Sequence, residues 1–116
     1  MPFVTKNFTV DQGATFTFDI IWKDSNDQVI DLTGYSAKMQ VRDQAGGKQL
    51  AFTLTHTDGI AINGPLGKLV VTISAERTNK MIYPKSYYDI LLTAPDNVTK
   101  TRILEGTLTL NRAVTV

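Results

Sequence analysis

The chain of 116 residues contains no cysteine and only one histidine, His56. The lack of cysteine excludes disulfide bonds, thiolate metal ligands and thiol nucleophiles. A catalytic triad would need a serine and a carboxylate around His56, and no Gly-x-Ser-x-Gly elbow occurs in the sequence. A transition-metal site would need further soft ligands. We therefore expect no enzymatic activity, no catalytic or metal-binding residues and no cofactor, with His56 exposed in a turn.

Strong charge of one sign and long apolar runs are also missing. Twelve Lys and Arg stand against eleven Asp and Glu, so the net charge is +1. The basic residues are scattered from Lys6 to Arg112, whereas a nucleic-acid binder gathers a basic excess in one patch. Apolar runs such as residues 90–92 are far shorter than the roughly 18 residues of a membrane helix. The first residues lack the features of a secretory signal. We expect no nucleic-acid or membrane partner, and synthesis in a reducing cytoplasm.

What the sequence has in abundance is β-branched residues, with 16 Thr, 9 Val and 9 Ile. These side chains fit a pleated strand better than a helix. Apolar and polar residues alternate with a period of two along several segments, which is the pattern of strands with one buried face. The segments are 14–23, 35–42, 60–62, 68–73, 87–93 and 103–110. In this phase Trp22 belongs to the core.

Turn-forming residues separate these segments, as at 23–27, 45–47, 63–67 and 95–97. Short strands at this spacing indicate a sandwich or barrel. We predict a single domain, 1–116, built as an antiparallel, immunoglobulin-like β-sandwich of about eight strands. The terminal segments 3–10 and 110–116 are candidates for edge or swapped strands.

One segment has no alternation and is predicted to be helical. Ser74 can cap a helix, and the Ala-Glu-Arg that follows suits a first turn. We expect one short helical turn near residues 75–80 that crosses from one sheet to the other. Met81 and Ile82 would then close the edge of the sandwich.

Two groups of carboxylates are considered as possible binding or catalytic sites. Asp24, Asp27 and Asp31 form the densest group, and calcium takes oxygen ligands. The spacing of a calcium-binding loop is missing, and Asp is also a common turn former, so a turn is preferred. Asp19 and Glu105 both fall on outward faces, where a solvated ion-pair surface is preferred to a glycosidase pair.

An outward apolar set suggests a protein–protein interface. Phe16, Phe18 and Tyr88 fall on inward faces by alternation, whereas Tyr87 and others do not. Outward apolar side chains can mark a partner surface, although a small sandwich also exposes some apolar atoms without a function. The predicted interface residues are Ile21, Tyr87, Leu91 and Ile103.

Five segments, in order and with similar spacing, resemble small structural proteins of tailed phages and prophages. The resemblance spans residues of about 12 to 115, and no single segment is specific. The segments are WKD (22–24), DLTGYSAKMQVRD (31–43), SAE (74–76), YDILL (88–92) and ILEGTL (103–108).

The resemblance implies a β-sandwich similar to the N-terminal domain of upper baseplate proteins of siphophages. In those proteins the domain docks on the tail, and a fibre segment that follows carries receptor-binding proteins. This chain departs from that pattern, because no fibre segment follows the predicted sandwich. We therefore expect an adaptor in the virion near the tail, baseplate or tail fibres, oligomeric in the particle and bound to other virion proteins. The alternatives are a capsid decoration protein and a carbohydrate-binding module that recognises host-surface glycans.

Overall fold

A computed structural model describes residues 4–42, 50–81 and 84–112, which form nine strands and one short helix. The strands are β1 (Val4–Thr5), β2 (Phe8–Asp11), β3 (Phe16–Ile21), β4 (Ser36–Arg42), β5 (Leu50–Thr55), β6 (Ile60–Asn63), β7 (Lys68–Ile73), β8 (Lys85–Thr93) and β9 (Lys100–Asn111). The helix is α1 (Ala75–Asn79).

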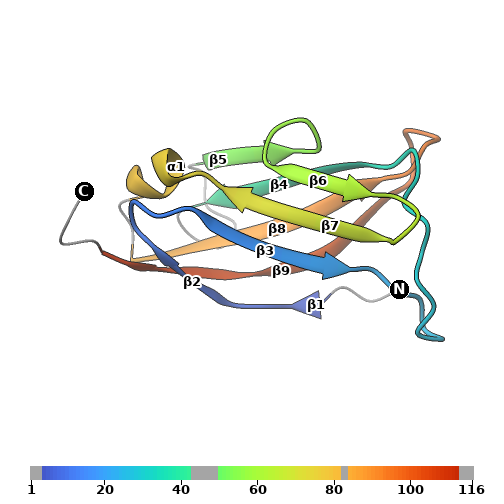
Figure 1. Ribbon diagram of the computed structural model, residues 1–116, viewed down its shortest axis with the longest axis horizontal. Coiled ribbons are helices and arrows are strands. Elements are labelled where there is room, and N and C mark those ends of the chain that lie inside the picture. The colour runs from blue at the N-terminus through green and yellow to red at the C-terminus, as the bar shows by residue number, and fades with distance from the viewer. Residues whose placement is uncertain (1–3, 43–49, 82–83, 113–116) are drawn as a thin grey trace.

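The strands form two sheets that pack face to face (Figure 1). The six-stranded sheet has the order β1-β9-β8-β4-β5, with β2 also paired to β9, and the three-stranded sheet has the order β3-β7-β6. β1 and β2 continue one another in a single parallel register along β9, so the nine strands occupy eight positions. From β3 to β9 this is the strand order of an immunoglobulin-like sandwich with one strand, β5, added after β4, while the N-terminal strand pairs with β9 rather than with β3. The predicted sandwich of about eight strands with one helical turn is confirmed.

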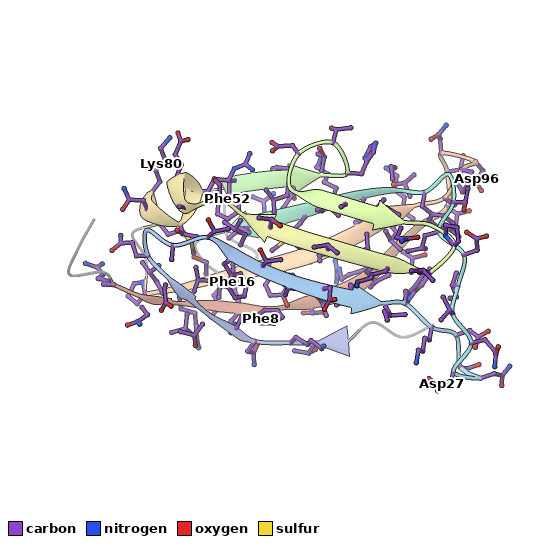
Figure 2. The ribbon with its side chains drawn as sticks, viewed as in Figure 1. Phe8, Phe16, Asp27, Phe52, Lys80 and Asp96 are labelled. Carbon is purple, nitrogen blue, oxygen red and sulfur yellow. The ribbon has the colours of Figure 1, made fainter. Side chains whose placement is uncertain are left out.

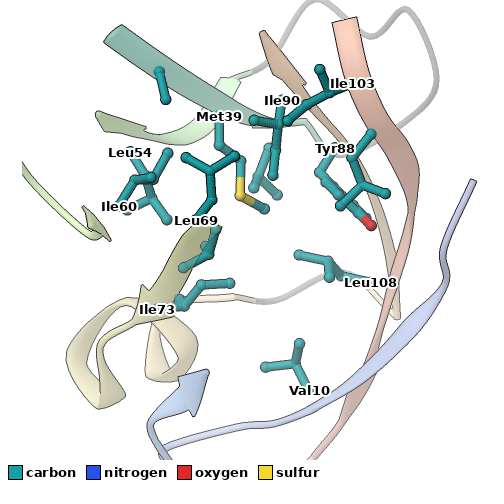
Figure 3. Close-up of a cluster of buried hydrophobic side chains, with 14 of the residues drawn as sticks. Val10, Met39, Leu54, Ile60, Leu69, Ile73, Tyr88, Ile90, Ile103 and Leu108 are labelled. Atoms are coloured by element: carbon teal, nitrogen blue, oxygen red, sulfur yellow. The ribbon is translucent and has the colours of Figure 1, made fainter. Parts of the chain in front are cut away.

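The core lies between the sheets and contains most of the predicted inward positions (Figure 3). Strands such as β7 and β8 alternate buried and more exposed residues, because successive side chains point to opposite faces. The largest fully buried side chains are Leu32, Met39, Leu54, Leu69, Ile73, Ile90, Leu92, Leu104 and Leu108. Trp22, expected in the core, follows the end of β3 and is only half-buried against it.

Helix α1 crosses between the sheets where the alternation stops. The Ser74 side chain accepts a hydrogen bond of 3.2 Å from the backbone N–H three residues on, which is an N-cap. Thr78 is fully buried, and its hydroxyl donates to the Ala14 carbonyl at 2.8 Å, so the helix is tied to the chain entering β3. Met81 is buried, as predicted, and Ile82 lies outside the described residues.

The N-terminal strand is held against β9 at a glycine. Between β1 and β2 the backbone of Lys6 passes directly over Gly106, where any side-chain carbon would collide with the Lys6 carbonyl. The Lys6 N–H donates to the Glu105 carbonyl at 2.9 Å, and the Lys6 carbonyl accepts a 2.8 Å hydrogen bond from the Tyr88 hydroxyl. A glycine is needed here because two backbones approach closely.

β2 closes one side of the sandwich with an aromatic cluster. Phe8 stacks on Phe18 with ring centroids 4.5 Å apart and meets Phe16 edge to face at 5.5 Å. Tyr88 completes the cluster from β8, 6.1 Å from Phe8. Such pairs stabilise a fold beyond the area they bury, so β2 is joined to both sheets.

The prediction for the two terminal segments is half correct. β1 and β2 pair only with β9 and therefore form an edge of the six-stranded sheet, while Phe3 lies outside the described residues. Leu110 and Asn111 belong to β9, which lies between β2 and β8, so the described part of the C-terminal segment is not an edge. Residues 113–116 lie outside the described residues.

Candidate interaction surfaces

Two of the predicted interface residues, Tyr87 and Leu91, lie together on the outer face of the six-stranded sheet. Both are half-buried on β8, with Asp89 between them. Directly opposite on the neighbouring strands, Leu91 faces Lys38 on β4 and Arg102 on β9. Because side chains directly opposite on antiparallel strands are close enough to touch, the stems of these two cations flank Leu91.

We call the outward side chains of β4, β8 and β9 the basic face. It holds five cations and two carboxylates, a net charge of about +3 by residue type. The cations are Lys38, Arg42, Lys85, Lys100 and Arg102, and the carboxylates are Asp89 and Glu105. Arg102 lies 3.5 Å from Asp89 and 4.0 Å from Glu105, so one cation serves both carboxylates. Beside the basic face, on edge strand β2, Asp11 accepts a 2.9 Å hydrogen bond from Asn111.

A groove of about 190 Å³ crosses the basic face at Leu91. It is lined by Lys38, Gln40, Asp89, Leu91 and Arg102. Within the ranges that the structure describes, Lys38 has no carboxylate within ion-pair distance. The groove thus combines an apolar floor with a cation whose charge is not balanced by a direct neighbour.

The prediction that Ile103 faces outward is wrong. Ile103 is 2% exposed and belongs to the core. The reason is a bulge: Ile90 pairs with Leu104 but Leu91 pairs with Arg102, which leaves one extra residue on β9. An extra residue shifts the alternation by one position, so two consecutive residues of β9 point inward.

Ile21 lies on the opposite sheet from Tyr87 and Leu91. It is 53% exposed at the end of β3 and pairs with Lys68. Ile21 and Ile103 both line a groove of about 400 Å³ between β3 and β9. The four predicted residues therefore do not form one surface: Tyr87 and Leu91 lie on the outer face of the six-stranded sheet, and Ile21 and Ile103 lie at the groove between the sheets.

The sequence-based interpretation missed a third surface, which we call the loop end. It comprises Ile21 and the connecting segments 22–35, 64–67 and 94–99. Every large apolar residue that is exposed in the described ranges lies here: Ile21 (53%), Val29 (46%), Leu66 (58%) and Val98 (79%). The four exposed apolar residues lie at one end of the sandwich, which makes this end a candidate contact surface.

Two segments of the loop end, 22–35 and 64–67, are joined by backbone hydrogen bonds. The Leu32 N–H donates to the Gly64 carbonyl at 2.8 Å, and the Trp22 N–H donates to the Gly67 carbonyl at 2.8 Å. Gly67 has φ of +59°, and a side chain there would run into the carbonyl of Ile30. Hydrogen bonds therefore join two of the three segments, and 94–99 is held by its own hydrogen bonds, in which the Ala94 and Asn97 N–H groups donate to the Thr99 and Ala94 carbonyls.

Aspartates fix the turns in two of the three segments of the loop end, 22–35 and 94–99. Asp24 accepts backbone hydrogen bonds from Asn26 and Gln28, so the predicted turn is confirmed. Asp31 accepts from Thr33, and these hydrogen bonds hold the pKa of Asp31 below its ordinary value. Asp96 accepts from the backbones of Val98 and Thr99, which lowers its pKa in the same way.

The loop end also carries a net negative charge. Its four aspartates, the three above and Asp27, stand against Lys23 alone. Lys23 lies 3.5 Å from Asp27. Figure 2 shows Asp27 and Asp96 at the same end of the sandwich, opposite Lys80 next to α1.

The remaining titratable side chains form no further cluster in the described ranges. No three His, Asp or Glu side chains there are placed to hold a metal ion. His56 is exposed in a turn, as predicted. Asp19 pairs with Lys68 at 3.4 Å on the three-stranded sheet, whereas Glu105 lies on the six-stranded one, so the two carboxylates do not form a pair. Among the described residues, no helix has the length and apolarity to cross a membrane.

Comparison with known proteins does not identify a family for this chain. No protein-family model matches the chain, and no curated protein matches its sequence.

Proposed function

We propose that this protein is a non-enzymatic structural component of a tailed-phage virion. It acts as an adaptor near the tail, baseplate or tail fibres and works through protein–protein contacts. It is made in the cytoplasm of the bacterial host and functions in the particle. The support from sequence is the ordered set of segments that resembles phage structural proteins.

The observation that carries the proposal is where those segments lie in the fold. WKD (22–24) opens the loop after β3, and DLTGYSAKMQVRD (31–43) begins with the Asp31 turn and includes β4. The three remaining segments supply the cap of α1, the centre of β8 and the bulged half of β9. The resembling segments thus run from the loop after β3 to β9 and include parts of strands and connections, so the resemblance covers most of the sandwich rather than one local motif.

The surfaces are suited to contacts between proteins. Tyr87 offers an aromatic ring on the basic face, with Arg42 and Thr107 on the neighbouring strands. Aromatic residues and arginine dominate the binding energy of many interfaces. A rigid sandwich also presents such groups without the entropic cost of ordering a loop.

Mass spectrometry of purified particles tests the proposal directly. The particles come from the phage, or the induced prophage, whose genome encodes this chain. We expect the chain in mature virions at a fixed stoichiometry to tail proteins. Its complete absence from virions contradicts the structural role. Its presence on capsids that lack tails supports the decoration alternative, and retention of selected sugars on a glycan array by the isolated chain supports a carbohydrate-binding module.

Tyr87→Ala tests whether the basic face is the adaptor surface. We expect the variant to weaken incorporation into particles by about 2 kcal/mol, the typical loss for an aromatic anchor. The melting temperature should stay close to that of the wild type, because Tyr87 is outside the core. The control is Val70→Ala, which truncates a half-buried residue on the outer face of the three-stranded sheet. Equal loss in both variants would argue against the basic face.

A further inference from the structure

The basic face has more positive charge than its own carboxylates balance. Asp89 and Glu105 share Arg102, which leaves Lys38, Lys85 and Lys100 without an ion pair among the described residues. Lys38 and Lys85 lie at two ends of the stretch of β4 and β8 that holds Leu91 and Tyr87. An apolar centre with cations around it fits a partner surface that is apolar and acidic.

The loop end of the same molecule has that chemistry. Its apolar side chains protrude, with Val98 79% exposed and Leu66 58% exposed. Asp27, with its side chain 86% exposed, and Asp96 supply negative charge around them. Because hydrogen bonds within and between its segments fix the backbone of the loop end, little conformational entropy is lost on docking.

We propose that the loop end of one copy docks on the basic face of a second copy. Val98 and Leu66 of the first copy contact Leu91 and Tyr87 of the second, while the aspartates of the loop end approach Lys38 and Lys85. Contacts between like surfaces are disfavoured, because two basic faces or two loop ends would bring charges of the same sign together. The complementary pairing is therefore a heterologous contact, in which each copy uses two different surfaces.

Two heterologous surfaces on one molecule have a definite consequence for assembly. Each copy still offers a free loop end and a free basic face after the first contact, so association continues beyond a dimer into a ring or a row. The end of the sandwich measures about 25 × 24 Å, so the contact is at the small end of specific interfaces. We therefore expect dissociation constants in the micromolar range, roughly 1–100 μM, for the isolated chain.

Sedimentation velocity of the purified full chain tests the proposal. We expect the average mass to rise with concentration past that of a dimer. Salt should weaken the association, since roughly 1 M salt shortens the screening length to about 3 Å. A wild-type chain that stays monomeric at about 1 mM, where a micromolar contact is saturated, overturns the proposal.

Charge reversal identifies the two surfaces. The face variant is Lys38→Glu with Lys85→Glu, and the loop variant is Asp27→Lys with Gln28→Lys. All four side chains are exposed, and none accepts or donates a turn hydrogen bond through its side chain among the described residues. Each variant alone should lose association by tenfold or more. Lys80→Glu, next to α1 at the opposite end, is the control and should associate like the wild type.

The mixture of the two variants gives the decisive result. The loop variant has a neutral loop end, with three aspartates against three lysines, and keeps its basic face, whereas the face variant loses the positive charge of its face and keeps its acidic loop end. In the equimolar mixture the intact loop end of the face variant can dock on the intact basic face of the loop variant, so the mixture should form a heterodimer that neither variant forms with itself. A mixture that stays monomeric while both variants are folded contradicts the pairing of these two surfaces. Association that stops at a wild-type dimer also contradicts it, because that result indicates a contact between like surfaces. These measurements use the isolated chain, so their outcome is independent of whether virions contain it.

Discussion

The outer face of the six-stranded sheet carries five cations and two carboxylates on β4, β8 and β9, whereas that of the three-stranded sheet carries only Lys68 and Asp19. The two charges of the smaller face pair with each other at 3.4 Å, and its other outward residues are mostly small or β-branched. The larger face has a groove and unbalanced lysines.

The two sheets also differ in the regularity of their strands. The pairs β3–β7 and β6–β7 run without a break in register, whereas β4–β5 and β8–β9 each contain an irregularity. β9 additionally accommodates the N-terminal strand over Gly106. The shared core therefore requires only alternation, whereas the irregular pairings and the close backbone contact at Gly106 all belong to the six-stranded sheet.

The largest expected effect comes from filling the close contact on the six-stranded sheet. Gly106→Val places a branched side chain where the Lys6 carbonyl passes, so β1 and β2 must move away from β9. We expect a loss of about 3 kcal/mol in the free energy of unfolding, at the upper end of overpacking effects. Urea unfolding measures it.

The matched control for Gly106→Val is Ala61→Val on the outer face of the three-stranded sheet. Ala61 is exposed on β6, and a β-branched residue suits a strand there, so the change should stay within about 0.5 kcal/mol. A cost below about 1 kcal/mol for Gly106→Val would show that the N-terminal strand is not fixed by this contact.

The next largest effect removes the hydrogen bond that holds the same contact. Tyr88→Phe leaves the Lys6 carbonyl without its 2.8 Å partner, which should cost about 1–2 kcal/mol. Burial raises the pKa of Tyr88 well above its ordinary value. The folded protein therefore keeps the hydroxyl protonated, while this tyrosine ionises above about pH 10 in the unfolded chain. As pH rises past that point, the unfolded chain is favoured and the free energy of unfolding falls.

The measurement for Tyr88→Phe is the melting temperature between pH 7 and 11. The wild type should lose stability above about pH 10 more steeply than the variant, because the variant cannot ionise at this position. Tyr35→Phe is the control, since no hydrogen bond of the Tyr35 hydroxyl is found in the described structure. Parallel pH profiles for wild type and Tyr88→Phe would contradict a buried, protonated hydroxyl.

The sequence predicts most of the core because alternation is a local signal. Met39, Leu69 and Ile90 all lie inward as their period of two requires. The predicted strands do not include β5, although Leu50, Phe52 and Leu54 alternate with smaller or polar residues directly after a glycine-rich segment. A period-two pattern of only three apolar residues next to a turn is easily assigned to the loop.

The interface was predicted less well, and the reason is non-local. The bulge that turns Ile103 inward depends on how β9 pairs with β8, and no residue type in this part of the sequence predicts it. The loop end brings Val29, Leu66 and Val98 to one end from segments far apart in sequence. Apolar residues within predicted turns are the only hint of this surface in the sequence. The topology is needed to show that these turns lie at the same end of the sandwich.

A smaller loss of stability is expected when the aspartates in the turns of the loop end are protonated. Hydrogen bonds lower the pKa of Asp31 and Asp96, so the unfolded chain binds more protons than the folded one in acid. Their contribution is present above the ordinary aspartate pKa, near pH 4, and is lost as pH falls below it. We expect the melting temperature to fall from pH 5 to pH 2.

The double variant Asp31→Asn with Asp96→Asn isolates this acid effect. Its melting temperature should depend less on pH between 5 and 2 than that of the wild type, because the two carboxylates no longer titrate. Asp27→Asn is the control, since the Asp27 side chain makes no turn hydrogen bond among the described residues. An unchanged slope in the double variant would mean that other carboxylates control acid unfolding.

The smallest effects compare one ion pair on each outer face. Lys68→Ala removes the exposed pair with Asp19 and should change the free energy of unfolding by less than about 0.5 kcal/mol. Arg102→Ala should cost more, about 0.5–1 kcal/mol, because Asp89 and Glu105 are directly opposite each other and lose the cation that separates their charges.

Urea unfolding at low and high salt distinguishes the two cases. The cost of Arg102→Ala should shrink in high salt, where the repulsion between the two carboxylates is screened, while that of Lys68→Ala stays near zero. Equal costs at both salt concentrations would show that the charges of the basic face are no more coupled than those of the three-stranded face.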